Sequence, residues 1–181
     1  MTCIIGVEGH DWKVYMWWDK ISSNGTSSDE TTDPKVFRNG ELLFGTCGSM
    51  RMRNLLQYKL QVPVQANKQK DYKYLVDVVI TSIIKTYDEW WFTRKEEDAK
   101  KGGHVLIWYR WAVYVLQSDF SVYRSSRWFK ALGCWSDYAE WALHLVNDKF
   151  DNPRKAIATA ILAAHEFCPG TVSKKCDIIS L

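Results

Sequence analysis

Residues 2–7 read Thr-Cys-Ile-Ile-Gly-Val, and this stretch decides how the rest of the chain is interpreted. The run is apolar and rich in β-branched residues, which is typical of a buried β-strand. Thr2 opens it, and removal of Met1 before this small residue would leave Thr2 with a free α-amine. Because an α-amine has a pKa of roughly 7.7–8.0, it can accept the proton of the neighbouring hydroxyl near neutral pH. Thr2 is therefore a candidate N-terminal nucleophile, although Met-Thr is also a common way for a chain to begin.

Further motifs follow the first strand in a fixed order. Asp19 ends the next apolar run in Trp-Trp-Asp-Lys, and Lys35 stands sixteen positions later in Asp-Pro-Lys-Val. The segment 39–49 reads Asn-Gly-Glu-Leu-Leu-Phe-Gly-Thr-Cys-Gly-Ser, which predicts a strand that ends in a Gly-x-x-Gly-Ser turn and opens a helix. Taken alone, Asp19 and Lys35 could equally form a surface ion pair at a strand end.

Together these residues resemble the β-type subunits of the proteasome family, and most closely the bacterial ATP-dependent threonine protease of that family. The resemblance covers nearly the whole chain. It implies an α+β fold, the four-layer αββα sandwich of the N-terminal nucleophile hydrolases, as a single domain over 1–181. It also implies a threonine-type endopeptidase that cleaves peptides or unfolded proteins inside a self-compartmentalised homo-oligomeric ring, fed by an ATPase unfoldase.

The resemblance implies a role for each motif residue. Thr2 corresponds to the nucleophile, and Lys35 to the lysine whose positive charge favours an unprotonated amine and an alkoxide-like oxygen. Asp19 corresponds to the aspartate that holds and neutralises this lysine. The backbone N–H of Gly45 corresponds to the oxyanion donor. A glycine that merely relaxes the end of a strand is the alternative for Gly45.

Substrate-binding positions follow from the same correspondence. Ser23 stands where the family's loop pairs with the extended main chain of the substrate, although Ser-Ser-Asn-Gly would suit any loop. Cys47 is expected at the first specificity pocket. By position, the candidates for the lining of that pocket are Asp33, Phe37, Leu43, Cys47 and Arg51.

One part of the chain departs from the family pattern. The family has a Gly-Ser-Gly turn whose serine forms a hydrogen bond near the nucleophile, whereas this chain reads Gly-Cys-Trp-Ser over 133–136. Either Cys134 supplies a weak donor or Ser136 takes its place. Asp137 is a further supporting candidate, with a carboxylate in the first turn of a helix as its alternative. The family's second Asp/Ser pair is not recognisable over 167–173.

The composition is that of an ordinary soluble globular protein, with 46% hydrophobic and 25% charged residues. A net charge of +3 without a basic stripe argues against nucleic-acid binding. No apolar run approaches the roughly 20 residues that cross a bilayer, and no secretory signal is recognisable. We therefore expect a cytoplasmic protein with neither a nucleic-acid nor a membrane partner.

Cysteine and histidine spacing gives no sign of a metal or a disulfide framework. The five Cys include no Cys-x-x-Cys, and Cys3, Cys47 and Cys134 fall in apolar or turn segments, so we expect small buried thiols. The four His lie far apart in the sequence without the spacing of metal ligands. We expect no metal and no cofactor.

The order of predicted elements is strands, two helices, strands, two helices and a final strand. Residues 22–34 are expected to be an exposed loop, and 94–101 a solvated loop or helix end. We predict strands over 2–8, 12–18, 35–38, 41–47, 104–109, 111–117, 120–124, 128–132 and 176–181. We predict helices capped by Ser49, over 72–91, from Ser136 to about Val146, and from Pro153 with an inner face that extends to Phe167.

Two other functions stay open at this point. The first is a small-molecule amidohydrolase of the wider N-terminal nucleophile class, with the same fold and chemistry. The second is a non-catalytic assembly subunit, in which a retained Met1 leaves Thr2 without a free amine.

Overall fold

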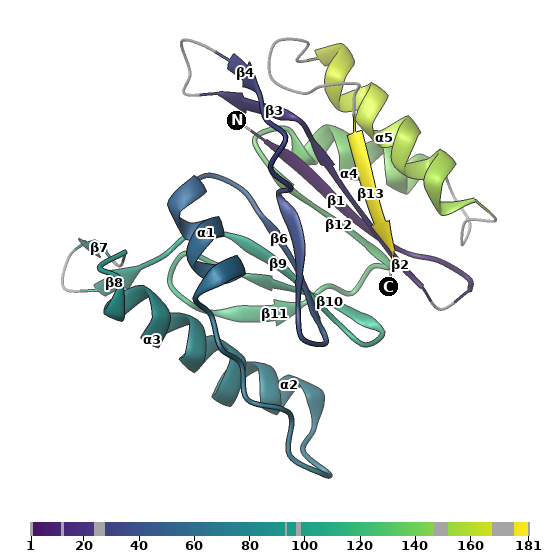
Figure 1. Cartoon of the computed structure of the whole chain (residues 1–181). Helices are drawn as coiled ribbons and strands as arrows, with labels where there is room; N and C mark the ends of the chain where they lie inside the picture. Colours follow the sequence, from purple (N-terminus) through teal and green to yellow (C-terminus); the bar gives the residue numbers. More distant parts are fainter. Residues whose placement is uncertain are drawn as a thin grey trace.

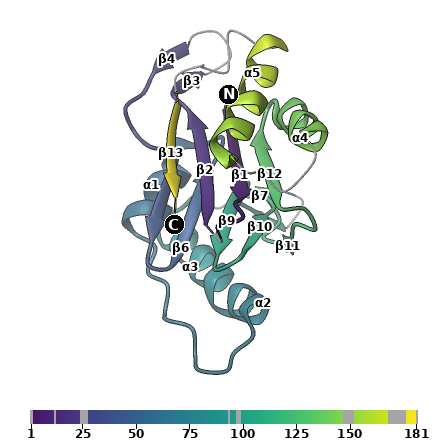
Figure 2. The ribbon, with the colours of Figure 1, turned by 90° about the vertical axis from the view of Figure 1, so that its right-hand side faces the viewer.

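The computed structural model describes residues 2–11, 13–23, 28–92, 94–96, 99–146, 152–167 and 176–180. These residues form a mixed α/β fold with a four-stranded and a five-stranded sheet (Figures 1 and 2). The first sheet consists, in spatial order, of β12 (Phe129–Gly133), β1 (Cys3–Glu8), β2 (Val14–Asp19) and β13 (Cys176–Ser180). The second consists of β11 (Val122–Arg124), β10 (Ala112–Leu116), β9 (Val105–Tyr109), β6 (Leu42–Thr46) and β5 (Val36–Asn39).

Helices accompany each sheet. The first set begins with α1 (Met50–Tyr58) and continues with α2 (Asp71–Tyr74), which runs through the π-helical turn η1 (Leu75–Ile80) into α3 (Thr81–Glu89). The second set is α4 (Ser136–Leu145) and α5 (Pro153–Phe167). Figure 1 shows α1 and α3 on one side of the two sheets and α4 and α5 on the other.

Three buried clusters account for this arrangement. Apolar side chains of the second sheet pack against α1, η1 and α3, among them Phe44, Ile107, Leu56, Val79 and Ile83. Those of the first sheet pack against α4 and α5, among them Ile5, Trp17, Leu143, Ile157 and Ala160. The third cluster joins the sheets face to face, with Ile4 and Met16 from one and Leu43, Leu106 and Trp108 from the other. Because successive side chains of a strand alternate between faces, a strand buried on both faces supplies two clusters.

Several local predictions are wrong in detail. The expected loop over 22–34 contains the hairpin β3 (Ile21–Ser23) and β4 (Ser28–Glu30), and 94–101 contains β7 (Arg94–Glu96) and β8 (Ala99–Lys101). Phe167 is 63% exposed instead of facing inward, because it stacks on Tyr138 of α4, with 4.6 Å between the ring centroids.

The turn between β5 and β6 lies one residue later than expected. Asn39 pairs with Leu42, so the turn residues are Gly40, with φ +61°, and the residue after it. A glycine with positive φ at the first turn position fits the two-residue hairpin turns that follow the twist of the strands. The Asn39 amide is held in place by two hydrogen bonds that it donates to the Leu56 and Leu60 carbonyls, at 3.1 and 3.0 Å.

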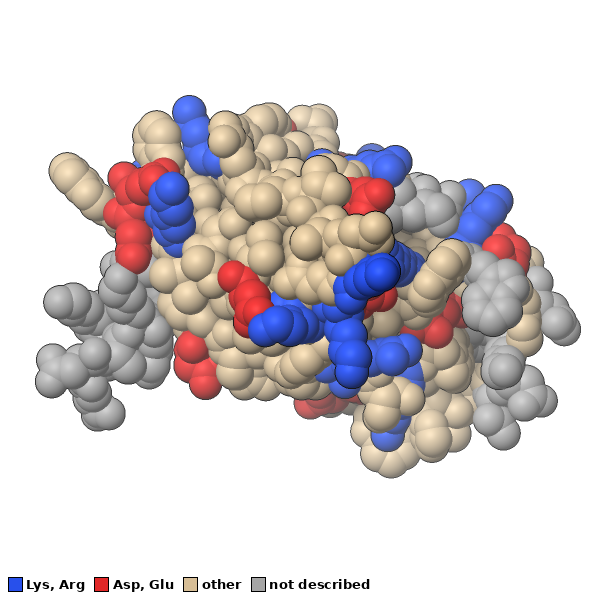
Figure 3. Space-filling view, turned by 90° about the horizontal axis from the view of Figure 1, so that it is seen from below, with Lys and Arg blue, Asp and Glu red and all other residues tan. Residues whose placement is uncertain are grey.

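Charged side chains of both signs share the surface. Figure 3 shows Lys and Arg beside Asp and Glu on the face seen from below. Two ion pairs of this kind are Arg110–Asp71 at 2.7 Å and Lys73–Asp77 at 2.6 Å. Within the described part of the chain, no helix combines the length and the apolar character that a membrane span requires.

Candidate active site

The ends of several strands converge at one end of the two sheets. Within the first sheet, Cys3 of β1 pairs with Gly133 of β12, and Asp19 ends the neighbouring strand β2. Within the second sheet, the Lys35 carbonyl accepts a hydrogen bond from the N–H of Thr46 at 3.0 Å, so Lys35 lies opposite the end of β6. The antiparallel registers thus bring residues from distant parts of the sequence to the start of β1, where Thr2 lies.

Lys35 and Asp19 form a buried ion pair beside this strand start. The Lys35 Nζ lies 3.1 Å from Asp19 Oδ1, and the two side chains are 7% and 0% exposed. Lys35 also donates a hydrogen bond to the carbonyl of Ile21. Burial on this scale excludes the surface ion pair that the sequence left open.

Asp19 ties the lysine to the strand that carries Thr2. Its Oδ1 accepts a hydrogen bond from the N–H of Cys3 at 2.9 Å, and its Oδ2 accepts one from the N–H of Ile21 at 3.3 Å. Since Cys3 directly follows Thr2, the carboxylate fixes the position of Thr2 relative to Lys35 through the backbone. A buried carboxylate needs several hydrogen-bond donors, and the N–H groups of Cys3 and Ile21 together with Lys35 supply them.

Burial also shapes the protonation of the pair. Desolvation lowers the pKa of Lys35 below the usual lysine value, against the opposing attraction of Asp19. Desolvation likewise raises the pKa of Asp19, against the attraction of Lys35 and the backbone donors.

Thr2 is 8% exposed and is held from the side of β12. Its carbonyl accepts a hydrogen bond from the N–H of Cys134 at 3.1 Å. Gly133 makes this contact possible, because a Cβ at Gly133 would come within 1.8 Å of the Thr2 oxygen and its φ is +121°. Only glycine tolerates both conditions.

The predicted role of Gly45 is wrong. Gly45 lies inside β6 and pairs with Val36 on one side and Leu106 on the other. Since the N–H of Thr46 points to β5 and successive N–H groups alternate, the Gly45 N–H points to β9 and belongs to the ladder. A Cβ at Gly45 would come 2.6 Å from Met16 Cε, so this glycine allows the two sheets to approach each other.

The second glycine of the same motif, Gly48, was not singled out in the sequence and has different surroundings. It lies beyond the end of β6 and before α1, is exposed, and has φ +98°. Among the described residues, no atom outside its chain neighbours lies within 4 Å of the position that a Cβ would take. The Gly-x-x-Gly-Ser motif contains both glycines: the first lies within the strand, and the second, Gly48, follows it.

The three supporting residues predicted after β12, namely Cys134, Ser136 and Asp137, have different surroundings. Cys134 adjoins Thr2 through its backbone and is exposed, contrary to the expected buried thiol. The Ser136 hydroxyl donates to the carbonyl of Gly133 at 3.0 Å and so braces the turn. Asp137 is exposed in the first turn of α4 and lines a cavity with Arg127 and Trp141 on the outside of that helix.

The expected substrate positions are only partly brought together. Ser23 pairs with Ser28 through the backbone, and its side chain lies outside the described part. Cys47 is partly buried, with its Sγ 4.0 Å from the carbonyl of His104. Phe37 and Leu43 cannot line a specificity pocket, because they are buried in two different apolar clusters.

The two other candidates for that pocket make polar contacts. Arg51 donates to the carbonyl of Trp90 at 2.6 Å. Asp33 contacts Arg53 at 3.1 Å, and Arg53 is buried whereas Asp33 is exposed. Both residues therefore stay among the positions that could meet a substrate.

Two thiols near the site, those of Cys3 and Cys47, are poor nucleophiles. Burial raises the pKa of Cys3 to about 12 and that of Cys47 to about 11. At neutral pH both are thiols, whereas the thiolate is the reactive form. Among the described residues there is also no group of three His, Cys, Asp or Glu side chains that could hold a metal ion.

No protein-family model and no curated protein sequence matches this chain. Solved structures do match. Thiobacillus denitrificans BPH in complex with epoxomicin superimposes with a TM-score of 0.80 at 16% identity, over 99% of this chain and 98% of that one. Eukaryotic HslV from Trypanosoma brucei superimposes with a TM-score of 0.69 at 17% identity, over 99% of both chains.

The chain has the fold of the HslV-type, proteasome-like proteins. The Anbu protein of Pseudomonas aeruginosa, solved as a helical assembly, adds a TM-score of 0.66 at 16% identity, over 99% of this chain and 81% of that one. The resemblance drawn from the sequence motifs is thus confirmed for the fold. At such low identities a shared fold does not show a shared reaction. The reaction has to be argued from the residues of this chain.

Proposed function

We propose that this protein is a threonine peptidase of the N-terminal nucleophile hydrolase class, built as one domain over 1–181 with a four-layer αββα sandwich. The observation that carries the proposal is the buried Lys35–Asp19 pair, which is bonded to the strand start next to Thr2. Burying two charges costs several kcal/mol per ion unless good geometry and additional hydrogen bonds offset that cost. A catalytic role explains why the Lys35–Asp19 pair is buried at this position.

The proposed reaction starts once Met1 is removed. The Thr2 Oγ attacks the carbonyl carbon of a peptide bond, and its proton passes to the α-amine of Thr2. The positive charge of Lys35 lowers the pKa of the Thr2 α-amine, so that the amine is free to accept a proton, and it stabilises negative charge on the Thr2 Oγ. The tetrahedral intermediate collapses as the C–N bond breaks, and the leaving amine takes the proton from the α-amine. Water then cleaves the ester at Thr2 and restores the hydroxyl.

Gly48 is the proposed donor to the oxyanion of this intermediate. Its position beyond β6 leaves its surroundings open to substrate, and the absence of a side chain permits close approach of a peptide backbone. A preorganised donor of this kind contributes on the order of 10²–10³ in rate. Cys134 is placed to position Thr2 through its backbone N–H, and Ser23 and Cys47 stay proposed contacts for the substrate.

The proposed setting is a cytoplasmic homo-oligomeric ring that admits peptides or unfolded proteins, with an ATPase unfoldase as partner. Support comes from the fold neighbours, one of which forms a helical assembly and one of which is seen with epoxomicin. An enclosed chamber would keep the nucleophile of a small subunit away from folded proteins.

Hydrolysis of fluorogenic peptides by three purified proteins tests the proposal. The wild-type chain and Thr2→Ser, which keeps a hydroxyl, should both turn over substrate, whereas Thr2→Ala should be inactive with an unchanged circular dichroism spectrum. Intact-mass measurement should show the loss of Met1. Hydrolysis confined to small acyl amides would replace the peptidase with an amidohydrolase, and a retained Met1 with no turnover would favour a non-catalytic subunit.

A further inference from the structure

A second cavity, of about 170 Å³, lies at the end of the sheets opposite the candidate active site. Its lining comes from the turn between β1 and β2, from Trp111 in the turn between β9 and β10, and from Trp128 just before β12. Strand β1 joins the two places, with Cys3 at one end and Glu8 at the other. At about 3.3 Å per residue, this separates the cavity from the site by roughly 17 Å.

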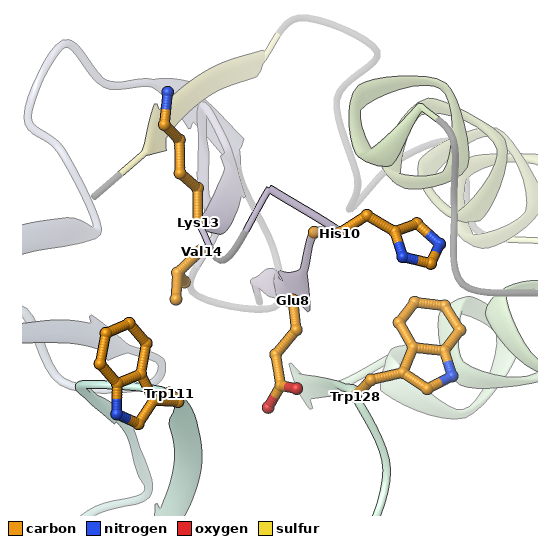
Figure 4. Close-up of a pocket in the computed structure, with 7 residues that line it drawn as sticks. Glu8, His10, Lys13, Val14, Trp111 and Trp128 are labelled. Atoms are coloured by element: carbon orange, nitrogen blue, oxygen red, sulfur yellow. The ribbon is translucent and has the colours of Figure 1, made fainter.

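Glu8 supplies the negative charge of this cavity. Figure 4 shows its carboxylate extending into the space between Trp111 and Trp128. The carboxyl is partly buried, and desolvation raises its pKa even though Arg124 acts in the opposite direction. A carboxylate that has lost part of its water is stabilised when a cation comes into contact with it.

The walls are fixed and offer aromatic faces. The N–H of Glu8 donates to the carbonyl of Trp128 at 2.8 Å, which holds the tryptophan beside the acid. The Trp128 ring packs edge-on against Phe129, with 4.7 Å between the centroids. Trp111 is 63% exposed, so part of its ring is open to a ligand. Indole faces attract cations through their negative quadrupole.

Lys13, a basic residue of the lining, leaves room for a positive ligand. Figure 4 shows the ammonium group of Lys13 pointing away from Glu8. The same group lies 4.0 Å from the carboxylate of Asp11, outside the lining. The N–H of Gly9 donates to the carbonyl of Lys13 at 2.8 Å, which keeps the hairpin turn closed and fixes this orientation of the backbone.

We propose that this cavity binds the positively charged head of an organic ammonium compound, with Glu8 as its counter-ion and the indoles of Trp111 and Trp128 as its walls. The combination of one acid and two indoles recognises methylated ammonium groups, because such groups are weakly hydrated and interact with aromatic faces. The volume fits a head group and excludes a folded element. The head group can come from a free small molecule or from a modified lysine side chain.

Choline and 3,3-dimethyl-1-butanol form a matched pair of probes, because they share a shape and differ in charge. Binding is followed by the indole N–H signals of protein labelled with ¹⁵N-tryptophan, assigned with Trp111→Phe and Trp128→Phe. We expect choline to shift these two signals with half-saturation on the order of 1 mM or below, and the neutral alcohol to bind at least about tenfold more weakly. A short peptide with trimethyllysine, tested in parallel, distinguishes a protein-borne source from a free one.

Two charge variants localise the effect. Glu8→Gln keeps the shape of the side chain and should weaken choline binding by at least about tenfold. Glu89→Gln removes an acid from α3, which does not line the cavity, and should leave choline binding unchanged. Thr2→Ala should also leave it unchanged, since the cavity is separate from the candidate active site.

Equal binding of the charged and neutral probes would overturn the proposal, because the cavity would then be merely apolar. Unchanged choline binding by a folded Glu8→Gln variant would overturn it as well. So would the absence of a saturable indole shift with both choline and the trimethyllysine peptide. Binding of the peptide alone would support the same recognition chemistry with a protein as its source.

Discussion

At the scale of single residues, the lysine of the candidate site combines burial with charge. Lys35 is 5% exposed, and its ammonium contacts a carboxylate that is fully buried. Pairs of this kind seldom add net stability, because desolvation offsets the attraction between the charges. Removing only one partner is costly, since it strands the other charge. The buried pair therefore makes separate predictions for activity and for stability.

The pH dependence of kcat/KM should show the lowered pKa of Lys35. Activity should rise as the α-amine of Thr2 loses its proton, with a limb below its ordinary pKa of about 7.7–8.0, because the Lys35 charge disfavours the protonated amine. It should fall again as Lys35 loses its charge, and this second limb should lie below the ordinary lysine pKa of about 10.4, because burial favours the neutral form. An alkaline limb at or above that value would contradict the electrostatic role of Lys35.

Asp19→Asn should destabilise the fold through the stranded lysine. We expect a loss of about 3–5 kcal/mol in the free energy of unfolding, measured with urea, because the variant leaves the buried ammonium without a counter-charge. Asp77→Asn is the matched control: Asp77 pairs with Lys73 at 2.6 Å on the surface, and its loss should cost less than about 1 kcal/mol. Equal losses of unfolding free energy in the two variants would contradict the prediction that the buried lysine depends on Asp19 for its counter-charge.

At the scale of elements, the end of β12 fixes the position of the nucleophile. Gly133→Ala should displace Thr2, because the new methyl group would overlap the Thr2 carbonyl. Peptide hydrolysis should fall by at least tenfold, since small misplacements of a reacting group cost about 10² in rate.

Gly40→Ala provides the control for this change. Gly40 has φ +61°, and among the described residues no atom outside its chain neighbours lies within 4 Å of the position that its Cβ would take. The substitution therefore adds only the backbone strain of about 1–2 kcal/mol that any left-handed residue carries. Gly40→Ala should keep its activity. Equal activities of the two variants would show that the close contact between residue 133 and the Thr2 carbonyl does not affect peptide hydrolysis.

Sequence patterns predicted the long elements well, because burial imposes a strong period. The spacing of Leu75, Val79, Ile83 and Tyr87 predicted the helix over 72–91, which the structure shows from Asp71 to Glu89. The π-helical turn η1 inside it was not predictable. Its wider turn keeps residues spaced by four on one face, whereas an ordinary helix of 3.6 residues per turn would drift. No residue type marks such a turn in the sequence.

The site was predicted less completely than the fold. Asp19 and Lys35 were predicted from the resemblance to the family motif, in which the two residues stand sixteen positions apart, and the structure shows them as a buried ion pair. The oxyanion donor was assigned to Gly45 because a glycine at a strand end and one within it look alike in a sequence. Only the pairing of Gly45 with Leu106 shows that β6 extends past it. Likewise, the exposure of Cys134 depends on where β12 ends.

At the scale of the whole molecule, the surface is consistent with an assembly. Large apolar side chains of α4 and α5 are exposed, among them Trp141 by 67%, Leu145 by 74% and Leu162 by 53%. Exposed apolar patches often mark contacts between proteins. The outer side of these helices is therefore a natural place for contacts between subunits.

Multi-angle light scattering after size exclusion should give a mass several times that of the 21.1 kDa chain. The mass should depend little on protein concentration in the micromolar range, as expected for a closed ring. A clean monomer across that range would contradict the proposed compartment and would leave the nucleophile open to folded proteins.

The central claim is that the hydroxyl of Thr2, freed of Met1, is a nucleophile activated by Lys35. Its most direct test is to incubate the protein with epoxomicin, the compound seen in the Thiobacillus structure, and to map the adduct by peptide mass spectrometry. We expect one adduct per chain, located at Thr2, and a much slower reaction of Lys35→Ala. An adduct elsewhere, or none on a folded chain that has lost Met1, would contradict it.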